Sequence, residues 1–333
     1  MERFRYRPID LDLPSFRLVR LLKGADEPIR RELIYAWLSG DDALEYEALS
    51  YTWRGTTKPR DIEIDGMVLP VTENLSVALQ HLRRQDQDRI LHQVQQMGDI
   101  YSQAEQVTVC LGPAAFATDI LLESLRTLQT QHIKSGGGAW MPADPRWLTV
   151  WLAVEPVLIQ KHLNPETLQR NGLQTLLKRP WFKRVWILEE VANAKRVIVY
   201  SGTQFISGSY FVLVSTLMGA SIGHHVQSAL DFMPGPSRNH SWWSQTRDLY
   251  TLLTNLKKSE ATDPRDMVYA LRVISISSDR SIHKLHADYT KSTNRVVSEV
   301  RSYLFKDTWT KKDAINFFNQ RGNEVWIAAA QKA

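Results

Sequence analysis

The pattern of hydrophobic and polar positions in the first third of the chain predicts β-structure. Residues 46–53 form a compact apolar run, which is typical of a buried strand. Residues 62–71 alternate between apolar and polar positions on both sides of Asp65 and Gly66. This dipeptide favours a tight hairpin, because both of its positions readily adopt positive φ. We therefore expect one buried strand followed by a β-hairpin.

Helical spacing begins directly after the hairpin. Thr72 is a suitable N-cap for a helix that carries Leu75, Leu79 and Leu82 on one face. A second helix is expected over residues 92–104. The pattern then predicts a strand, a helix and another strand, in that order, at 107–111, 119–131 and 196–200. This alternation indicates an α/β fold with a parallel sheet and flanking helices.

The rest of the chain is expected to be mostly helical. A helix over 165–178 is followed by a Trp-rich helix that opens at Pro180, a residue suited to the first helical position. Further helices are expected near 208–220, 241–257, 265–274 and 291–305. We accordingly predict an α/β domain at 1–205 and a mostly helical region at 206–333.

The composition is that of a soluble globular protein. The 333 residues are 43% hydrophobic and 23% charged, with a net charge of +5, which excludes a wholly disordered chain. The single cysteine, Cys110, excludes an internal disulfide and a multi-cysteine zinc site. No signal-peptide core is visible, and no apolar run reaches the roughly 18 residues that a spanning helix needs. The expected localisation is cytoplasmic, within the cell.

Four sequence motifs occur in order along the first 200 residues. They are the segments 46–53, 71–75, 93–104 and 179–191, which includes Trp-Phe-Lys-Arg-Val-Trp-Ile-Leu-Glu-Glu. A further segment, 263–271, lies near the end of the chain. Together these motifs resemble the heterokaryon-incompatibility (HET) domain of filamentous fungi.

The resemblance implies a role in fungal self/non-self recognition, a form of innate immunity in which incompatible fusion triggers programmed cell death. HET domains are remotely similar to TIR domains, so the resemblance also implies a TIR-like, flavodoxin-like sheet. Some TIR domains cleave NAD with one glutamate that follows a tryptophan by four residues. The same spacing from Trp186 selects Glu190 as the candidate catalytic carboxylate.

The chemistry of NAD cleavage suits such a residue. A carboxylate beside the ribose stabilises the oxocarbenium character that builds as the bond to nicotinamide breaks. Trp186 would then form a wall of the pocket.

The competing interpretation of Glu190 is that its role is purely structural. On a helical wheel Trp181, Val185 and Leu188 mark the apolar stripe, and Glu190 points almost opposite it, where a solvated glutamate belongs.

The end of the first strand offers a second candidate site. Ligands in open α/β sheets bind beyond the carboxyl ends of strands, so Trp53, Arg54 and Gly55 are candidate residues for binding NAD. HET domains usually place Gly directly after this Trp, whereas Arg54 intervenes here. Arg54 is therefore either a phosphate contact or an ordinary surface arginine.

One segment of the family pattern is missing between Leu91 and His92. HET domains have a full strand after the helix that ends here in Leu82 and Arg83, but this chain keeps only Ile90 and Leu91 of it. In a flavodoxin-like order this second strand is an edge, so the sheet is expected to form without it. We predict that residues 85–91 are only a connector.

Three functional hypotheses follow. The first is a signalling protein of heterokaryon incompatibility that acts through protein partners or as a homo-oligomer. The second is an NAD glycohydrolase that uses Glu190, with NAD as substrate and no required cofactor. The third is a defective product of a rearranged or wrongly assembled gene. The aromatic and basic run at 179–184 is attributed to the family motif rather than to nucleic-acid binding, and His283 and His286 are not expected to bind a metal.

Overall fold

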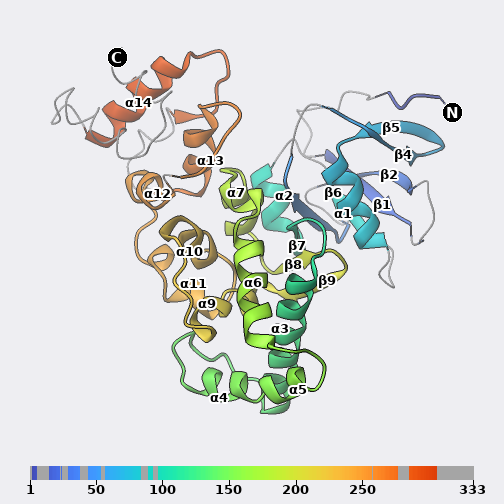
Figure 1. The fold of residues 1–333 in the computed structure, drawn as a ribbon. Helices are drawn as coiled ribbons and strands as arrows, with labels where there is room; N and C mark the ends of the chain where they lie inside the picture. Colours follow the sequence, from blue (N-terminus) through green and yellow to red (C-terminus); the bar gives the residue numbers. More distant parts are fainter. Residues whose placement is uncertain are drawn as a thin grey trace.

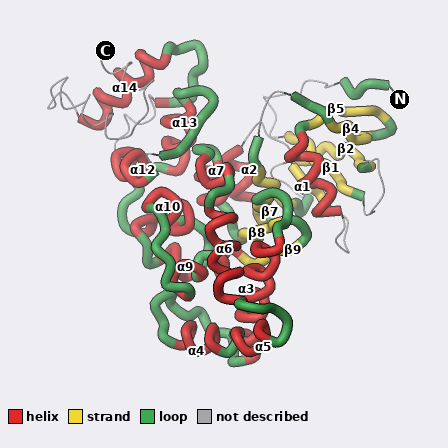
Figure 2. Tube along the Cα trace, in the orientation of Figure 1, coloured by secondary structure: helices red, strands yellow, loops and turns green. Residues whose placement is uncertain are grey.

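The structure is a computed structural model that describes most of the chain. The described residues are 2–5, 15–22, 24, 29–37, 44–53, 57–83, 89–92, 97–256, 258–276 and 285–305. Within them the N-terminal strands and the first helix lie on one side of the molecule and most of the helices lie on the other, with the last three strands between, as Figure 2 shows. The α/β class predicted from the sequence is confirmed.

Nine strands of the described residues form one mixed sheet, in the order β5-β4-β2-β1-β6-β3-β7-β8-β9. The strands are β1 (Ser15–Leu21), β2 (Arg30–Trp37), β3 (Glu47–Tyr51), β4 (Arg60–Ile64), β5 (Met67–Val71), β6 (Arg89–His92), β7 (Gln106–Cys110), β8 (Val197–Ser201) and β9 (Gln204–Ser207). Strands β6, β3, β7 and β8 are parallel to one another. This parallel core contains the three strands expected near 46–53, 107–111 and 196–200.

The prediction that residues 85–91 form only a connector is wrong. Residues Arg89–His92 form β6, which lies between β1 and β3 and is therefore not at an edge. Four residue pairs join β6 to β1 in antiparallel register, whereas two pairs join it to β3. The short segment forms a strand because the unforeseen β1–β2 hairpin supplies backbone partners along its whole length.

The hairpin predicted at Asp65 and Gly66 is confirmed. Strands β4 and β5 pair from Arg60–Val71 inward to Ile64–Met67. Asp65 and Gly66 have φ values of 50° and 75°, which is the left-handed conformation that a two-residue hairpin turn requires. Thr72 then accepts a hydrogen bond at Oγ1 from the Leu75 amide at 3.4 Å, so it caps the first helix as expected.

The helices between the hairpin and the last strands are α1 (Glu73–Arg83), α2 (Met97–Gln103), α3 (Phe116–Lys134), α4 (Arg146–Leu152), α5 (Glu155–Ile159), α6 (Pro165–Leu177), the 3-10 helix η1 (Pro180–Lys183) and α7 (Ile187–Ala192). The expected helix at 92–104 thus begins at Met97, because β6 takes its first residue. In Figure 1, α1 lies beside the N-terminal strands, α4 and α5 lie at the lower end, and the others lie in the middle.

The C-terminal part is mostly helical, as predicted, although its helices are shorter than expected. They are α8 (Gly208–Phe211), α9 (Val214–Leu217), α10 (His224–Asp231), α11 (Pro236–Asn239), the 3-10 helix η2 (Trp242–Ser244), α12 (Leu249–Asn255), α13 (Asp266–Ile274) and α14 (Thr293–Phe305). Helices α10 to α14 lie beyond α6 and α7, on the side opposite to α1 and the N-terminal strands (Figure 1). No described helix has the length and apolar character needed to cross a membrane.

Helices cover both faces of the sheet. Helix α1 places Leu75, Leu79 and Leu82 on one face, where they pack with residues of β1, β4 and β5. Helices α2, α3, α6 and α7 cover the other face, and their core continues without a break into α12, α13 and α14. The second core therefore joins the regions on either side of residue 205.

Candidate functional site

Glu190 is a buried carboxylate with partners on both oxygens. Only 2% of the residue is exposed. The Ser50 hydroxyl donates to its Oε2, and Arg184 Nη2 donates to its Oε1 at 3.2 Å, forming an ion pair. A buried charge needs such pairing, because removal from water disfavours an isolated carboxylate.

The same contacts join the first and last motifs of the N-terminal region. The Trp181 indole Nε1 donates to Ser50 Oγ at 2.7 Å, so the Ser50 hydroxyl accepts from Trp181 while it donates to Glu190. Arg184 also donates through Nη1 to the Tyr51 carbonyl at the end of β3. Ser50 and Trp181 are fully buried. The two motifs are therefore parts of one hydrogen-bonded unit around the end of β3.

The helical-wheel interpretation of Glu190 as a solvated residue is wrong. The Trp-rich segment is not one helix: η1 ends at Lys183, Arg184 is extended with φ −69° and ψ 132°, and α7 begins at Ile187. The extended residue bridges to Glu260 and changes the direction of the chain. A wheel drawn from residue 180 consequently assigns the wrong face to Glu190.

Glu189, the neighbouring carboxyl group, has a different environment. It is 3% exposed, and no described residue donates a hydrogen bond to its carboxylate. Burial raises the pKa of Glu189 to about 7, and the charges of Glu190 and Asp99 act in the same direction. A Cβ added to Gly98 would lie 2.8 Å from Glu189 Oε1, so α2 closes directly over this group. Glu189 is titratable near neutral pH, while Glu190 is held by hydrogen bonds.

Trp186, the proposed pocket wall, is tied to the C-terminal region. Its Nε1 donates to Asp266 Oδ2 at 3.1 Å, and Tyr289 donates to Asp266 Oδ1 at 2.7 Å. Burial raises the pKa of Asp266. Asp263 accepts hydrogen bonds from the amide and the guanidinium of Arg265. The 263–271 segment therefore positions α13 against Trp186.

Of the three residues predicted at the strand end, Trp53 lies in the described part of the chain, and it is exposed. Trp53 is 52% exposed, and its ring centroid lies 6.1 Å from that of Tyr51. Arg54 and Gly55 fall outside the described residues, as does His283. Among the described residues, no group of three or more His, Cys, Asp or Glu side chains is placed to hold a metal ion.

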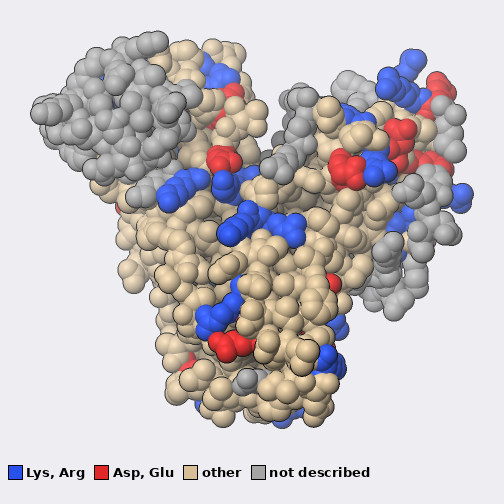
Figure 3. Space-filling view, in the orientation of Figure 1, with Lys and Arg blue, Asp and Glu red and all other residues tan. Residues whose placement is uncertain are grey.

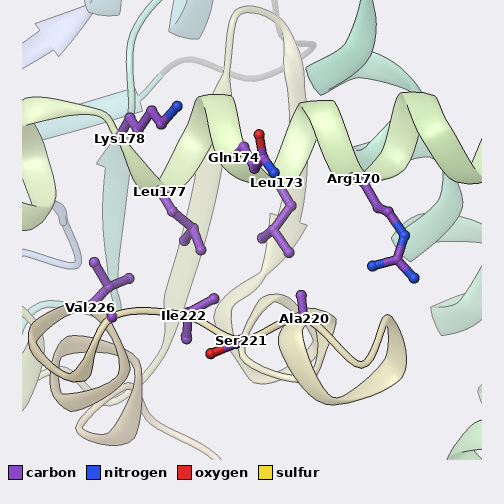
Figure 4. Close-up of a pocket in the computed structure, with 10 residues that line it drawn as sticks. Arg170, Leu173, Gln174, Leu177, Lys178, Ala220, Ser221, Ile222 and Val226 are labelled. Atoms are coloured by element: carbon purple, nitrogen blue, oxygen red, sulfur yellow. The ribbon is translucent and has the colours of Figure 1, made fainter.

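Two cavities lined by described residues lie elsewhere. One, of about 280 Å³, separates α6 from the segment 220–226; Figure 4 shows Leu173 and Leu177 pointing across it toward Ile222. The other, of about 380 Å³, is bordered by aromatic side chains that include Trp140. Glu190, Trp186 and Trp53 line neither cavity. Through these hydrogen bonds Glu190 joins β3, η1 and α7, and so it stabilises the fold.

The sequence analysis missed the partners of Glu190. Ser50 stands among apolar residues in β3, and Arg184 stands between exposed Lys183 and buried Val185 in the Trp-rich motif. A polar residue at an inward position of a buried strand needs a hydrogen-bond partner. That signal indicates that Ser50 is bonded, but it does not identify Trp181 and Glu190, which lie more than 130 residues away in sequence.

Comparison with known proteins assigns the segment that contains Ser50, Trp181, Arg184 and Glu190 to a family. Residues 46–190 match the family model of the heterokaryon incompatibility protein (HET), a range that begins just before β3 and ends at Glu190. The chain is a HET domain protein. It is a distant homologue of heterokaryon incompatibility protein 6, OR allele, of Neurospora crassa, with 22% identity over 332 residues, 79% of this chain and 48% of that protein. The chain thus spans about half the length of this relative. No solved structure gives a significant match.

Proposed function

We propose that the chain is a signalling module of heterokaryon incompatibility, which acts through protein association in fungal self/non-self recognition and programmed cell death. The proposal is supported by the HET family match at residues 46–190 and by the name of the Neurospora relative. It is carried by an exposed apolar surface on the helical end of the molecule.

This surface lies on α4, α5 and the turn that follows them. Leu148, Leu152, Ile159 and Leu163 are exposed by 53%, 59%, 57% and 91%. Leu148 and Leu152 are one turn apart on α4 and share a face. Figure 3 shows mostly uncharged atoms over α4 and α5 at the lower end of the molecule. Grouped exposed apolar side chains of this kind are typical of protein-binding surfaces.

The experiment compares the parent with a Leu152→Glu, Leu163→Glu double variant. Both positions are exposed, so the variant should remain folded while charge blocks association. We expect the parent to self-associate or to capture its partner and to trigger cell death when expressed in fungal cells. The double variant should stay monomeric and inactive. A fully active double variant would refute association through this surface.

NAD cleavage by Glu190 is the second candidate. Its support is the position of Glu190 beside the carboxyl end of the parallel strand β3, where α/β folds commonly bind ligands. Purified parent protein should then consume NAD, while Glu190→Gln, checked for folding by circular dichroism, should not. The occupied and buried carboxylate argues against this outcome, so we expect no NAD loss from either protein. This second candidate function includes the proposal that the HET domain of this chain is remotely related to TIR domains.

The hypothesis of a defective gene product is tested at the level of the transcript. The strand β6 is four residues long and runs across the proposed gap between Leu91 and His92. We expect transcript sequencing to show the codons for Leu91 and His92 directly adjacent, as in this chain. An additional exon at this point would show that the family's full second strand is present in the natural protein.

A further inference from the structure

Arg31 is a buried cation on the face of the sheet that α1 covers. It is the second residue of β2, in register with Leu21 of β1 and Ile64 of β4, which both belong to the apolar core on that face. Only 4% of Arg31 is exposed. Its Nε and Nη2 atoms have no hydrogen-bond partner in the described part of the chain.

The acidic residues next to Arg31 in the sheet are engaged elsewhere. Glu32 forms an ion pair with Arg20 at 3.0 Å, and Glu63 lies 3.9 Å from Arg30. Asp65 accepts a hydrogen bond from the Leu33 amide at 3.2 Å. None of these described carboxylates pairs with the Arg31 guanidinium.

A second arginine adds positive charge at the same place. Arg83, the last residue of α1, is 7% exposed, and its Nη2 would lie 2.3 Å from a Cβ added to Gly24. The Gly24 amide donates to the Arg83 carbonyl at 3.3 Å, which fixes the end of α1 beside the chain that leaves β1. The pKa of Arg31 is lowered to about 9, chiefly by burial and also by the charge of Arg83, while Tyr51 acts in the opposite direction.

A guanidinium with this environment is still protonated at neutral pH, because its pKa stays above 7. Burying a cation without an anion is unfavourable, and a neighbouring cation increases the cost. Arginine presents a planar set of donors that matches the oxygens of phosphate and carboxylate groups. An oxyanion between the two side chains would satisfy the free donors of Arg31 and offset the repulsion.

We propose that Arg31 and Arg83 form a binding site for a phosphate group, either free or carried by a small molecule such as a nucleotide. The site lies between the start of β2, the end of α1 and Gly24. It is separate from the exposed surface of α4 and α5, so it does not depend on the function proposed above. Because Gly24 has no side chain, the Arg83 guanidinium lies directly against its backbone at this site.

The test is thermal unfolding of the full chain in phosphate-free buffer, with added inorganic phosphate, AMP or sodium chloride at matched ionic strength. We expect 10 mM phosphate to raise the unfolding midpoint of the parent by about 3 °C. Chloride should give no comparable shift. A larger shift with AMP than with phosphate would identify a nucleotide as the ligand, and equal shifts would identify the free anion.

The diagnostic variant is Arg31→Met, with Arg20→Met as the matched control. Arg20 is an exposed arginine of the adjacent strand, and its side chain is 44% exposed. Arg31→Met should lose the phosphate shift and, without phosphate, melt at or above the parent temperature, because an apolar side chain replaces an unpaired buried charge. Arg20→Met should keep the shift.

Three results would overturn the proposal: no phosphate shift in the parent, an equal shift with chloride, or a phosphate shift that survives in Arg31→Met. If Arg31→Met fails to fold, phosphorus NMR of inorganic phosphate with the parent and with Arg83→Met decides the question. Line broadening with the parent that weakens at least tenfold in Arg83→Met supports the site. Equal broadening with both proteins contradicts it.

Discussion

At the residue scale, the central feature is the bonded unit of Ser50, Trp181, Arg184 and Glu190. Each member satisfies a group that burial would otherwise leave without a partner. Such a unit is sensitive to the loss of any member, because a remaining buried partner then lacks its hydrogen bond. The Trp-to-Glu spacing that suggested catalysis thus has a structural explanation of its own.

Glu190→Gln should lower the free energy of unfolding by about 3 kcal/mol, because it leaves the Arg184 guanidinium without its counter-charge. This value is at the low end for a broken buried pair, since the Arg184 side chain is 20% exposed. The control is Glu166→Gln, which breaks an exposed pair with Arg170 and should cost less than about 1 kcal/mol. Equal denaturant midpoints for the two variants would contradict the structural role.

Trp181→Ala should cost roughly 3–5 kcal/mol, the range for large aromatic truncations in cores. Trp181 is fully buried and also donates to Ser50, so the variant creates a cavity and removes a hydrogen bond. Trp53→Ala is the matched control, because that indole is 52% exposed, and it should change stability by less than about 0.5 kcal/mol. Urea melts of the three proteins measure both effects, and a Trp181→Ala midpoint equal to that of the parent would place Trp181 at the surface.

At the scale of elements, the packing of α7 against α2 and α13 determines the protonation state of the Glu189 carboxyl group. This carboxyl group lies beneath Gly98 of α2, near Asp99 and Glu190, and Val273 of α13 lies beside the same glycine. All the charged groups named around it are acidic, so both burial and repulsion favour its protonated form. The contact between these helices is consequently expected to respond to pH.

Stability should fall as the pH rises from about 4.5 to about 7. The folded protein holds the Glu189 proton up to a pKa of about 7, whereas the unfolded chain releases it near the ordinary glutamate pKa of 4.5. Between these values the folded state binds more protons, so deprotonation favours unfolding, by a few kcal/mol in all. Glu189→Gln should match the parent near pH 4 and exceed its stability at pH 8. Parallel stability curves for the two proteins would refute the raised pKa.

At the scale of the whole molecule, one apolar core runs from the sheet into the C-terminal helices. It includes residues of β3, α7, α13 and α14, and the bond between Trp186 and Asp266 crosses the same boundary. The domain boundary predicted at residue 205 stays a prediction. Because residues from both sides of this boundary share the core, the core affects whether the two parts of the chain fold independently.

A fragment of residues 1–205 should not fold cooperatively by itself. It would expose the surface of α7 that α13 covers in the full chain, where Leu188 packs in the shared core. We expect the full chain to unfold in one transition and the fragment to bind the dye ANS and melt without a sharp midpoint. A fragment with a cooperative melt and dispersed amide resonances would instead establish an independent domain.

Much of the α/β region could be predicted because its signals are local. The turn at Asp65 and Gly66, the cap at Thr72 and the three parallel strands all follow from short patterns. The β1–β2 hairpin was missed, and the error at β6 followed from it, since a strand of four residues depends on pairing with distant backbone. The solvent-facing assignment of Glu190 failed because a single extended residue, Arg184, breaks the helical period.

The sequence by itself determined the class of fold, the order of its main elements and the resemblance to HET domains. These depend on hydrophobic periodicity and on motifs that are continuous in the chain. Only the tertiary structure decided that Ser50 donates a hydrogen bond to Glu190 and that Trp186 donates one to Asp266 of α13. It also decided that Arg31 is buried without a described counter-ion. Burial and pairing of charge depend on which distant segments meet, and no local pattern contains that information.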